Sequence, residues 1–142
     1  MRLVDANVLI YAVNRGAIRH RAAKAWLDGA LSSRETLLIP WISLLAFLRL
    51  TTHHRVFEQP LTPDQALGVV ESWLSAPNVV VPETDAQHVR RIREHLIAAG
   101  GHGGNLINDA HLAALAVQYG AAVVTFDVDF SRFDAVQVER PD

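Results

Sequence analysis

The chain contains no cysteine, which excludes disulfide bonds and every metal site built on thiolates. This absence fits the reducing interior of a cell. No apolar run reaches the roughly 20 residues that a membrane-spanning helix needs. The segment from Met1 to Asp5 places an acid where a secretory signal peptide has a longer apolar stretch. These absences predict a cytoplasmic protein that does not enter a membrane.

Neither sign of charge dominates the sequence. The 13 Lys and Arg residues face 15 Asp and Glu residues, which gives a net charge of -2 with His neutral. Any positive surface for a nucleic acid would therefore have to be local. With 142 residues, half of them hydrophobic, the chain can bury one good core and is too short for two ordinary domains. We expect one domain over residues 1–142.

Short apolar runs alternate with helical patterns along the chain. Residues 7–12 either extend the first strand or begin a helix. The alternation predicts an α/β fold with a parallel sheet that is covered on both faces. The expected strands cover residues 2–5, 36–40, 78–82, 121–126 and 135–138, and the expected helices cover residues 19–31, 43–52, 62–75, 84–99 and 105–119.

Several helix ends carry characteristic residues. Thr62 and Gln65 form a capping-box pattern, with proline at the first helical position between them. Ser43 and the segment 84–87 are expected to cap the helices that follow them. Gly120 is expected to end the helix that begins near residue 105.

Three aspartates stand where a predicted apolar element meets a loop. Asp5 closes the first strand, Asp127 follows the fourth, and Asp109 lies about one turn into its helix. Ligands bind beyond the carboxyl ends of parallel strands, and a helix start favours negative charge. A buried carboxylate costs free energy unless something positive compensates it. Oxygen-rich acidic pockets suit Mg²⁺ or Mn²⁺, so we predict a divalent-metal site.

Each aspartate also has an ordinary explanation. Asp5 and Asp127 fit turn residues whose side chains bond to the nearby backbone, and Asp109 fits a common first-turn acid. The metal site is favoured because all three would otherwise reach the same edge of the sheet by coincidence.

Polar side chains accompany the acids at helix or strand spacing. Asn105 precedes one acid by four residues, and Thr125 precedes another by two, so each pair shares a face. Asn7 follows the first acid by two residues. We predict that these three side chains orient a carboxylate, a water molecule or a substrate. Asp129 is either a fourth metal ligand or a capping residue for a short helix that follows it.

The chain resembles the PIN-domain nucleases, and in particular the VapC-type toxins of bacterial toxin–antitoxin pairs. The resemblance rests on residues 3–11, 108–116 and 124–130, in this order and spacing, and extends over essentially the full length. It implies a PIN-like three-layer α/β/α domain with a central, mostly parallel sheet of about five strands. It also implies a metal-dependent endoribonuclease toxin, a cognate VapB-type antitoxin and a homodimer. The matched acids Asp5, Asp109 and Asp127 would hold Mg²⁺ or Mn²⁺ and activate water for RNA cleavage.

The chain departs from the family pattern in one place. That pattern has a second acid, often Glu, on the helix after the second strand. Phe47 holds the expected acidic position, and no acid occurs between Glu35 and Glu58. The alternative is therefore a degenerate PIN-like module that binds RNA or protein with little or no nuclease activity.

Basic residues for RNA would have to lie around the acidic pocket. Candidates occur after the first strand and on the helix that carries Phe47. Such side chains bind phosphate without reading sequence, although most surface cations only face solvent. The candidates are Arg15, Arg19, Lys24 and Arg49.

Overall fold

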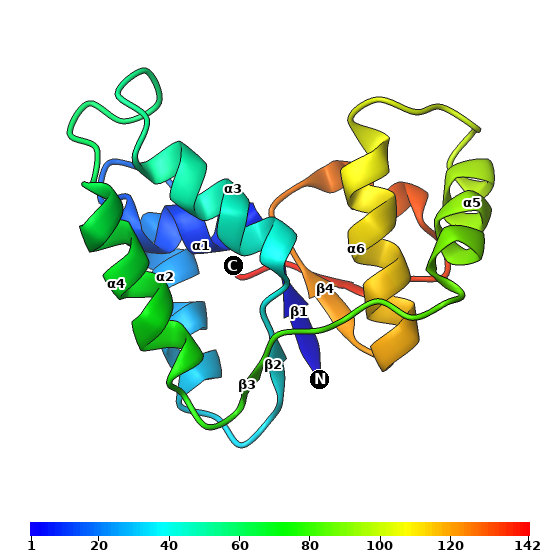
Figure 1. The fold of residues 1–142 in the computed structure, drawn as a ribbon, viewed down its shortest axis with the longest axis horizontal. Helices are drawn as coiled ribbons and strands as arrows, with labels where there is room; N and C mark the ends of the chain where they lie inside the picture. Colours follow the sequence, from blue (N-terminus) through cyan, green and yellow to red (C-terminus); the bar gives the residue numbers. More distant parts are fainter.

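Five short strands form one parallel sheet in the order β3-β2-β1-β4-β5 in a computed structural model that describes residues 1–142 (Figure 1). The central strand β1 pairs with β2 and β4, and Leu3 lies between Leu38 and Val123 in this register. All pairs are parallel, so the carboxyl ends of the strands meet at one edge. The strands are β1 (Arg2–Val4), β2 (Leu37–Leu38), β3 (Val79–Val80), β4 (Ala122–Val124) and β5 (Val138–Glu139).

Six α-helices and one 3₁₀ helix cover the sheet. Each predicted helix is present, and residues 7–12 belong to a helix rather than to an extended first strand. None of the helices combines the length and apolarity needed to cross a membrane. The helices are α1 (Ala6–Val13), α2 (His20–Leu31), α3 (Trp41–Thr51), α4 (Pro63–Leu74), α5 (His88–Ala98), α6 (Leu106–Tyr119) and η1 (Val128–Arg132).

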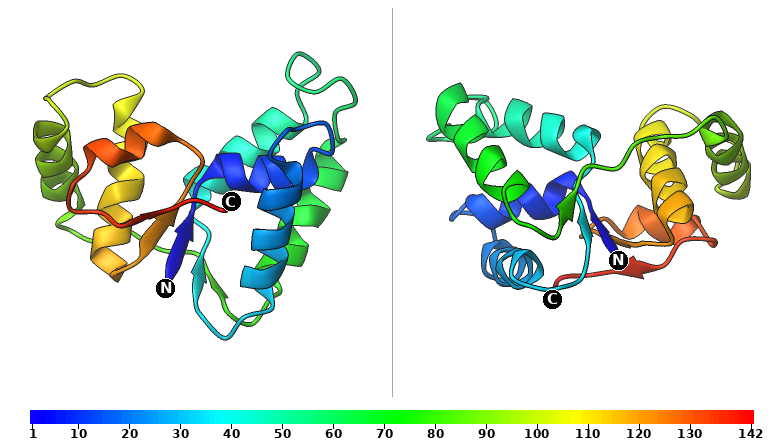
Figure 2. Two further views of the ribbon diagram at one scale, coloured as in Figure 1. Left: turned by 180° about the vertical axis from the view of Figure 1, so that it is seen from behind. Right: turned by 60° about the horizontal axis from the view of Figure 1, so that its bottom comes forward.

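Alternation along the central strands divides the core between the two faces of the sheet. Val4 belongs to a cluster with residues of α1, α2, α3 and α4, whereas Leu3 belongs to a second cluster with residues of α6 and η1. Figures 1 and 2 show α1 to α4 on one side of the sheet and α5 and α6 on the other. The predicted three-layer α/β/α fold is confirmed, and the sheet is entirely parallel.

Two predicted helix ends are confirmed in detail. The Thr62 hydroxyl accepts a hydrogen bond from the Gln65 N–H, and the Gln65 side chain accepts one from the Thr62 N–H. Gly120 takes a left-handed conformation with φ of 67°, which an L side chain rarely adopts, and ends α6.

Two other predicted caps are wrong. Helix α3 begins at Trp41, directly after Pro40, and Ser43 lies inside it. The Ser43 hydroxyl instead donates to the Val4 carbonyl (2.9 Å) and ties α3 to the end of β1. Helix α5 begins at His88 and has no side-chain cap, because the Asp85 carboxylate forms a turn with Gln87 before the helix.

Candidate active site

A cavity of about 510 Å³ lies beyond the carboxyl ends of β1 and β4. Its size is within the range of small-ligand sites. Asp5, Asp109 and Asp127 all line it, together with Asn7 and Asn105. The structure therefore brings the three predicted acids to one cavity, although they come from opposite ends of the chain.

Hydrogen bonds hold Asp5 in place at the end of β1. One carboxylate oxygen accepts from the Ala6 N–H (2.7 Å) and so caps α1. The other accepts from the Thr125 hydroxyl (2.7 Å) and from the Asn7 amide (3.0 Å). Burial raises the pKa of Asp5 above its usual value, and the charge of Asp127 adds to this, while the bond from Thr125 opposes it.

Asn7 and Thr125 connect β1 to the segment after β4. The Asn7 amide donates to the Thr125 hydroxyl (3.0 Å), and its oxygen accepts from the Phe126 N–H (3.1 Å). The Thr125 hydroxyl also accepts from the Asp127 N–H (3.0 Å). Asn7 thus hydrogen-bonds to the Asp5 carboxylate, and Thr125 bonds to both the Asp5 carboxylate and the Asp127 backbone.

Asp109 lies in the first turn of α6 and is half-buried at the cavity wall. Its pKa is raised to about 6, first by burial and then by the negative charges of Asp5, Asp127 and Asp129. A carboxylate with this environment lacks a compensating cation. Asn105, at the start of the same helix, also lines the cavity, as its spacing predicts.

Asp127 and Asp129 differ in position. Asp127 lines the cavity, and its carboxylate accepts from the Asp129 N–H (2.9 Å) to cap η1. Asp129 is exposed, does not line the cavity and lies 3.9 Å from the Arg132 guanidinium. The capping role considered for Asp129 thus belongs to Asp127, and Asp129 contributes only its negative charge at a distance.

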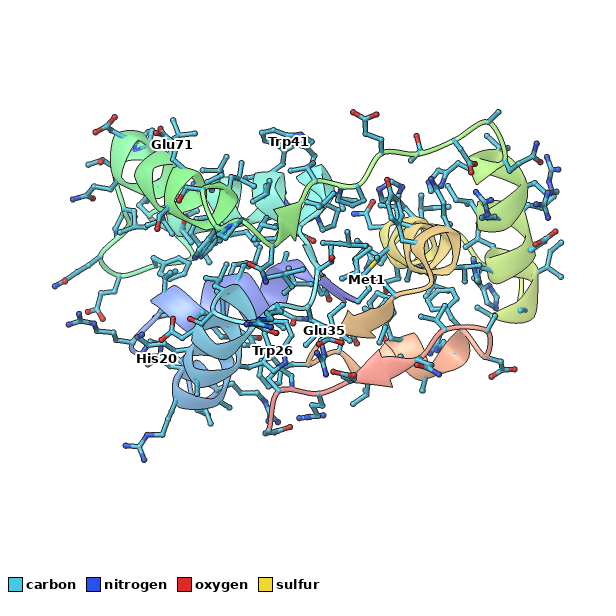
Figure 3. The ribbon with its side chains drawn as sticks, turned by 90° about the horizontal axis from the view of Figure 1, so that it is seen from below. Met1, His20, Trp26, Glu35, Trp41 and Glu71 are labelled. Atoms are coloured by element: carbon cyan, nitrogen blue, oxygen red, sulfur yellow. The ribbon has the colours of Figure 1, made fainter.

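Several carboxylates outside the cavity are paired with basic groups. The Arg2 guanidinium pairs with Glu35 and, at 2.7 Å, with Glu139. The Met1 amino group lies 3.4 Å from the same Glu35 carboxylate (Figure 3). At the carboxyl edge, neither Asp5 nor Asp109 has a salt-bridge partner. Asp5 and Asp109, which are both at least partly buried, therefore lie in the cavity without a basic side chain paired to them.

The donor set of this cavity fits a hard divalent cation. Carboxylate and amide oxygens line it, and the negative charges of neighbouring acids add to the raised pKa of Asp5 and Asp109. No three His, Cys, Asp or Glu side chains stand close enough together in this structure to hold a metal ion by themselves. Asp5, Asp109 and Asp127 are the side chains that could offer oxygens to such an ion, and waters would have to fill the rest of its shell.

Helix α3 and Val56, in the loop after it, also line the cavity with apolar side chains. We call the residues Ile42, Ala46, Leu50 and Val56 the aliphatic wall, and the residues Asp5, Asp109 and Asp127 the acidic wall. Figure 1 shows α3 and α6 on either side of the carboxyl end of β1.

The structure corrects the assignment of the missing acid to Phe47. Phe47 is completely buried, and its ring packs edge-on against Trp73 with 4.7 Å between ring centroids. The residue of α3 that faces the cavity one position earlier is Ala46. An acid at position 47 would point into the core, whereas an acid at position 46 would face the acidic wall.

The basic residues proposed for RNA do not line this cavity. Arg19 pairs with Asp142 (2.5 Å) and lies over the Phe126 ring, and Lys24 pairs with Asp28. The side chains of Arg15 and Arg49 are exposed and have no salt-bridge partner.

Sequence reasoning missed three residues of the cavity with polar groups, which are Asn108, Tyr11 and Ser43. Asn108 lies three residues after Asn105 on α6, so helix spacing could have indicated it. Tyr11 lines the cavity from α1 and stacks at a tilt against Phe126, with 5.5 Å between ring centroids. Its role depended on residues 7–12 being helical, which the sequence left open.

The PIN domain family model matches residues 2–136 of the chain. The chain is a VapC-type PIN-domain protein. Ribonuclease VapC37 of Mycobacterium tuberculosis is 44% identical over 141 residues, which cover 99% of this chain and 97% of that protein. Ribonuclease VapC31 of the same species is 36% identical, with 99% of each chain covered.

Solved structures that are similar to this VapC-type PIN domain have the same fold. A VapBC2 complex from Rickettsia felis, bound to a DNA fragment from its promoter, matches with a TM-score of 0.70 and 20% identity. The match covers 98% of this chain and 97% of that chain. Mycobacterium tuberculosis VapC20, a toxin that cleaves the sarcin–ricin loop, matches with a TM-score of 0.68 and 22% identity over 92% and 93% of the two chains.

Proposed function

We propose that this protein is the toxin of a VapBC-type toxin–antitoxin pair and a divalent-metal-dependent endoribonuclease. The observation that carries this proposal is the acidic wall, where three carboxylates line one cavity whose lining contains no Lys or Arg. The 44% identity to a named ribonuclease VapC supports the choice of RNA as substrate. Residues 1–142 would act as one PIN domain in the cytoplasm.

The proposed reaction is hydrolysis of an RNA phosphodiester, in which water forms a bond to phosphorus and the ester oxygen leaves. A bound Mg²⁺ or Mn²⁺ would supply charge neutralisation and a more acidic water. Asp5, Asp109 and Asp127 would hold this ion. Asp109 would accept the proton of the attacking water, since its carboxylate accepts no hydrogen bond from protein.

The polar residues around the acids would orient them rather than react. Thr125 and Asn7 hold the Asp5 carboxylate by hydrogen bonds of 2.7 and 3.0 Å. Asn105 would orient water or substrate at the cavity mouth. Misplaced carboxylates would bind the ion less tightly, so we expect these residues to affect rate and metal affinity together.

The partners of the protein follow from its relatives. Solved VapBC complexes of the same fold support a VapB-type antitoxin as the inhibitor, and we propose a homodimer as the form that binds it. Arg15, Arg19, Lys24 and Arg49 remain weak candidates for binding RNA phosphates outside the cavity.

One experiment tests the proposed activity. The antitoxin-free protein is incubated with a mixture of structured RNAs and Mn²⁺ or Mg²⁺, beside an Asp5→Asn variant and a sample with EDTA. We expect cleavage only for the wild-type protein with a metal ion. Equal cleavage by the Asp5→Asn variant would contradict the proposal, because the activity would then come from elsewhere.

A second candidate function rests on the absence of an acid on α3. Ala46 faces the acidic wall where a fourth carboxylate would complete the site. A PIN-like module that binds RNA or protein without cutting would have this feature. Retained RNA binding, without cleavage at any metal concentration, would favour this candidate.

A further inference from the structure

The aliphatic wall is an apolar part of the cavity lining that the proposed chemistry does not use. Ile42, Ala46 and Leu50 recur every four residues on α3, so they form one row along the helix. All three are only partly buried, and Val56 beyond them is 52% exposed. The aliphatic wall lines the same cavity as the acids. An open apolar surface inside a binding cavity indicates an apolar part of the ligand.

RNA offers one such part. Its phosphates and riboses need charges or hydrogen-bonding groups, and the side chains of the aliphatic wall supply neither. The faces of its bases are apolar and can pack against side chains when the base is unstacked. Tyr11, at the edge of the same cavity, adds an aromatic ring to this surface.

We propose that the aliphatic wall is a nucleobase subsite, which holds one unstacked base of the RNA beside the bond that is cut. This inference rests on the proposed function and specifies its substrate. The phosphate would face the acidic wall while the base of a neighbouring nucleotide packs on α3. The amides of Asn105 and Asn108, which line the cavity from α6, would face the edge of the base.

The subsite selects among RNA structures. A base in a duplex is paired and stacked, so it cannot enter a cavity unless it is flipped out at a cost of a few kcal/mol. A base in a single strand or a loop is available. We therefore expect the protein to bind single-stranded and looped RNA in preference to duplex RNA of the same sequence.

Binding measurements on matched variants test this subsite. The probe is a fluorescently labelled single-stranded RNA, compared with the same strand in a duplex, and all variants carry Asp5→Asn to prevent cleavage. Leu50→Gln and Val56→Gln place a polar group in the wall. Leu45→Gln is the control, since Leu45 is on the same helix, is 58% exposed and does not line the cavity.

We expect each wall variant to bind the single strand about tenfold more weakly, the loss of part of one buried apolar side chain. The Leu45→Gln control and the duplex should change less than about twofold. Val56→Gln keeps the test valid if Leu50→Gln fails to fold, because Val56 lies in a loop and packs in neither core cluster. An equal loss for all three variants, or no loss for the wall variants, would overturn the subsite.

An abasic nucleotide identifies the group that the wall contacts. We move one abasic position along the single strand and expect one position at which binding falls about tenfold. With the strand that is abasic at that position, Val56→Gln should weaken binding little further, because the base and the Val56 side chain would belong to one interaction. Independent, additive losses would mean that the wall contacts a part of the RNA other than this base, and would overturn the proposal.

Cleavage by the wild-type protein, measured with Mn²⁺ on the same strands, separates this inference from the proposed function. Cleavage that is insensitive to the base and to the wall would retain the nuclease and overturn the subsite. Base-sensitive binding without cleavage would retain the subsite and contradict the nuclease.

Discussion

The two walls of the cavity are built in opposite ways. The acidic wall gathers residues from β1, the start of α6 and the segment after β4, and hydrogen bonds to Thr125 and Asn7 fix part of it. The aliphatic wall comes almost entirely from one row of α3, placed by the packing of the buried face of that helix. Polar networks therefore position the groups that act on charge, and core packing positions those that contact apolar groups.

The largest expected effect comes from placing glutamate at each of two neighbouring residues of α3, one in the core and one at the cavity. Phe47→Glu would bury a carboxylate against Trp73, and we expect a loss of about 3–5 kcal/mol in the free energy of unfolding. Ala46→Glu would add a carboxylate at the cavity, so the protein should remain folded and bind Mn²⁺ more tightly. Urea unfolding and a Mn²⁺ titration measure the two results. Equal destabilisation by both substitutions would contradict the placement of Ala46.

Asp109→Asn tests how much folding stability the protein loses by holding three carboxylates in one cavity. We expect at least about a 100-fold loss of RNA cleavage, since the variant removes a metal ligand and the proton acceptor. Without metal, however, the variant should be more stable than the wild type at pH 7, by about 1–2 kcal/mol after solvent screening is allowed for.

The sign of this stability change follows from the pKa. Asp109 has a pKa of about 6 in the folded protein and 3.8 as a reference, so the folded state binds more protons in between. Wild-type stability should therefore fall as pH rises from about 4 to about 6. Thermal unfolding in EDTA across this range should give a flatter curve for Asp109→Asn. A steeper dependence of stability on pH for the variant would contradict the destabilising effect assigned to the Asp109 charge.

Thr125→Val tests whether the polar network positions Asp5. The variant loses the hydroxyl that donates to Asp5 and accepts from the Asp127 N–H. We expect about a tenfold loss of cleavage and a weaker apparent affinity for Mn²⁺. Thr125→Ser should restore both. Thr52→Val is the control, because the Thr52 hydroxyl donates only to helix carbonyls of α3.

The smallest expected effect concerns the surface cations. Lys24→Ala breaks an exposed pair with Asp28, and we expect a change below about 0.5 kcal/mol in the free energy of unfolding. Arg49→Ala removes an unpaired cation of α3 and should weaken RNA binding by less than about threefold. A filter-binding series at several salt concentrations measures this loss. A larger loss of RNA binding for Lys24→Ala than for Arg49→Ala would contradict the expectation that the unpaired cation contributes more than the paired one.

The meeting of the three acids could be predicted from the sequence, because parallel strands and a helix start share one edge of a sheet. The position of α3 could not. Whether Ala46 or Phe47 faces the cavity depends on how the helix rotates against α4, and Trp73 settles this through contacts distant in sequence. The predicted caps of α3 and α5 were wrong for a similar reason. Ser43 donates to the carbonyl of Val4 in β1, and Asp85 accepts a hydrogen bond within a turn before α5.

Two carboxylates of the acidic wall also cap helices, and this affects how mutations at the site should be interpreted. Asp5 accepts from the first N–H of α1, and Asp127 accepts from an N–H of η1. Asparagine keeps such a helix-capping bond, whereas alanine removes it and costs about 1 kcal/mol. An alanine scan would therefore mix damage to folding with damage to catalysis at these two positions, and overstate their importance relative to Asp109.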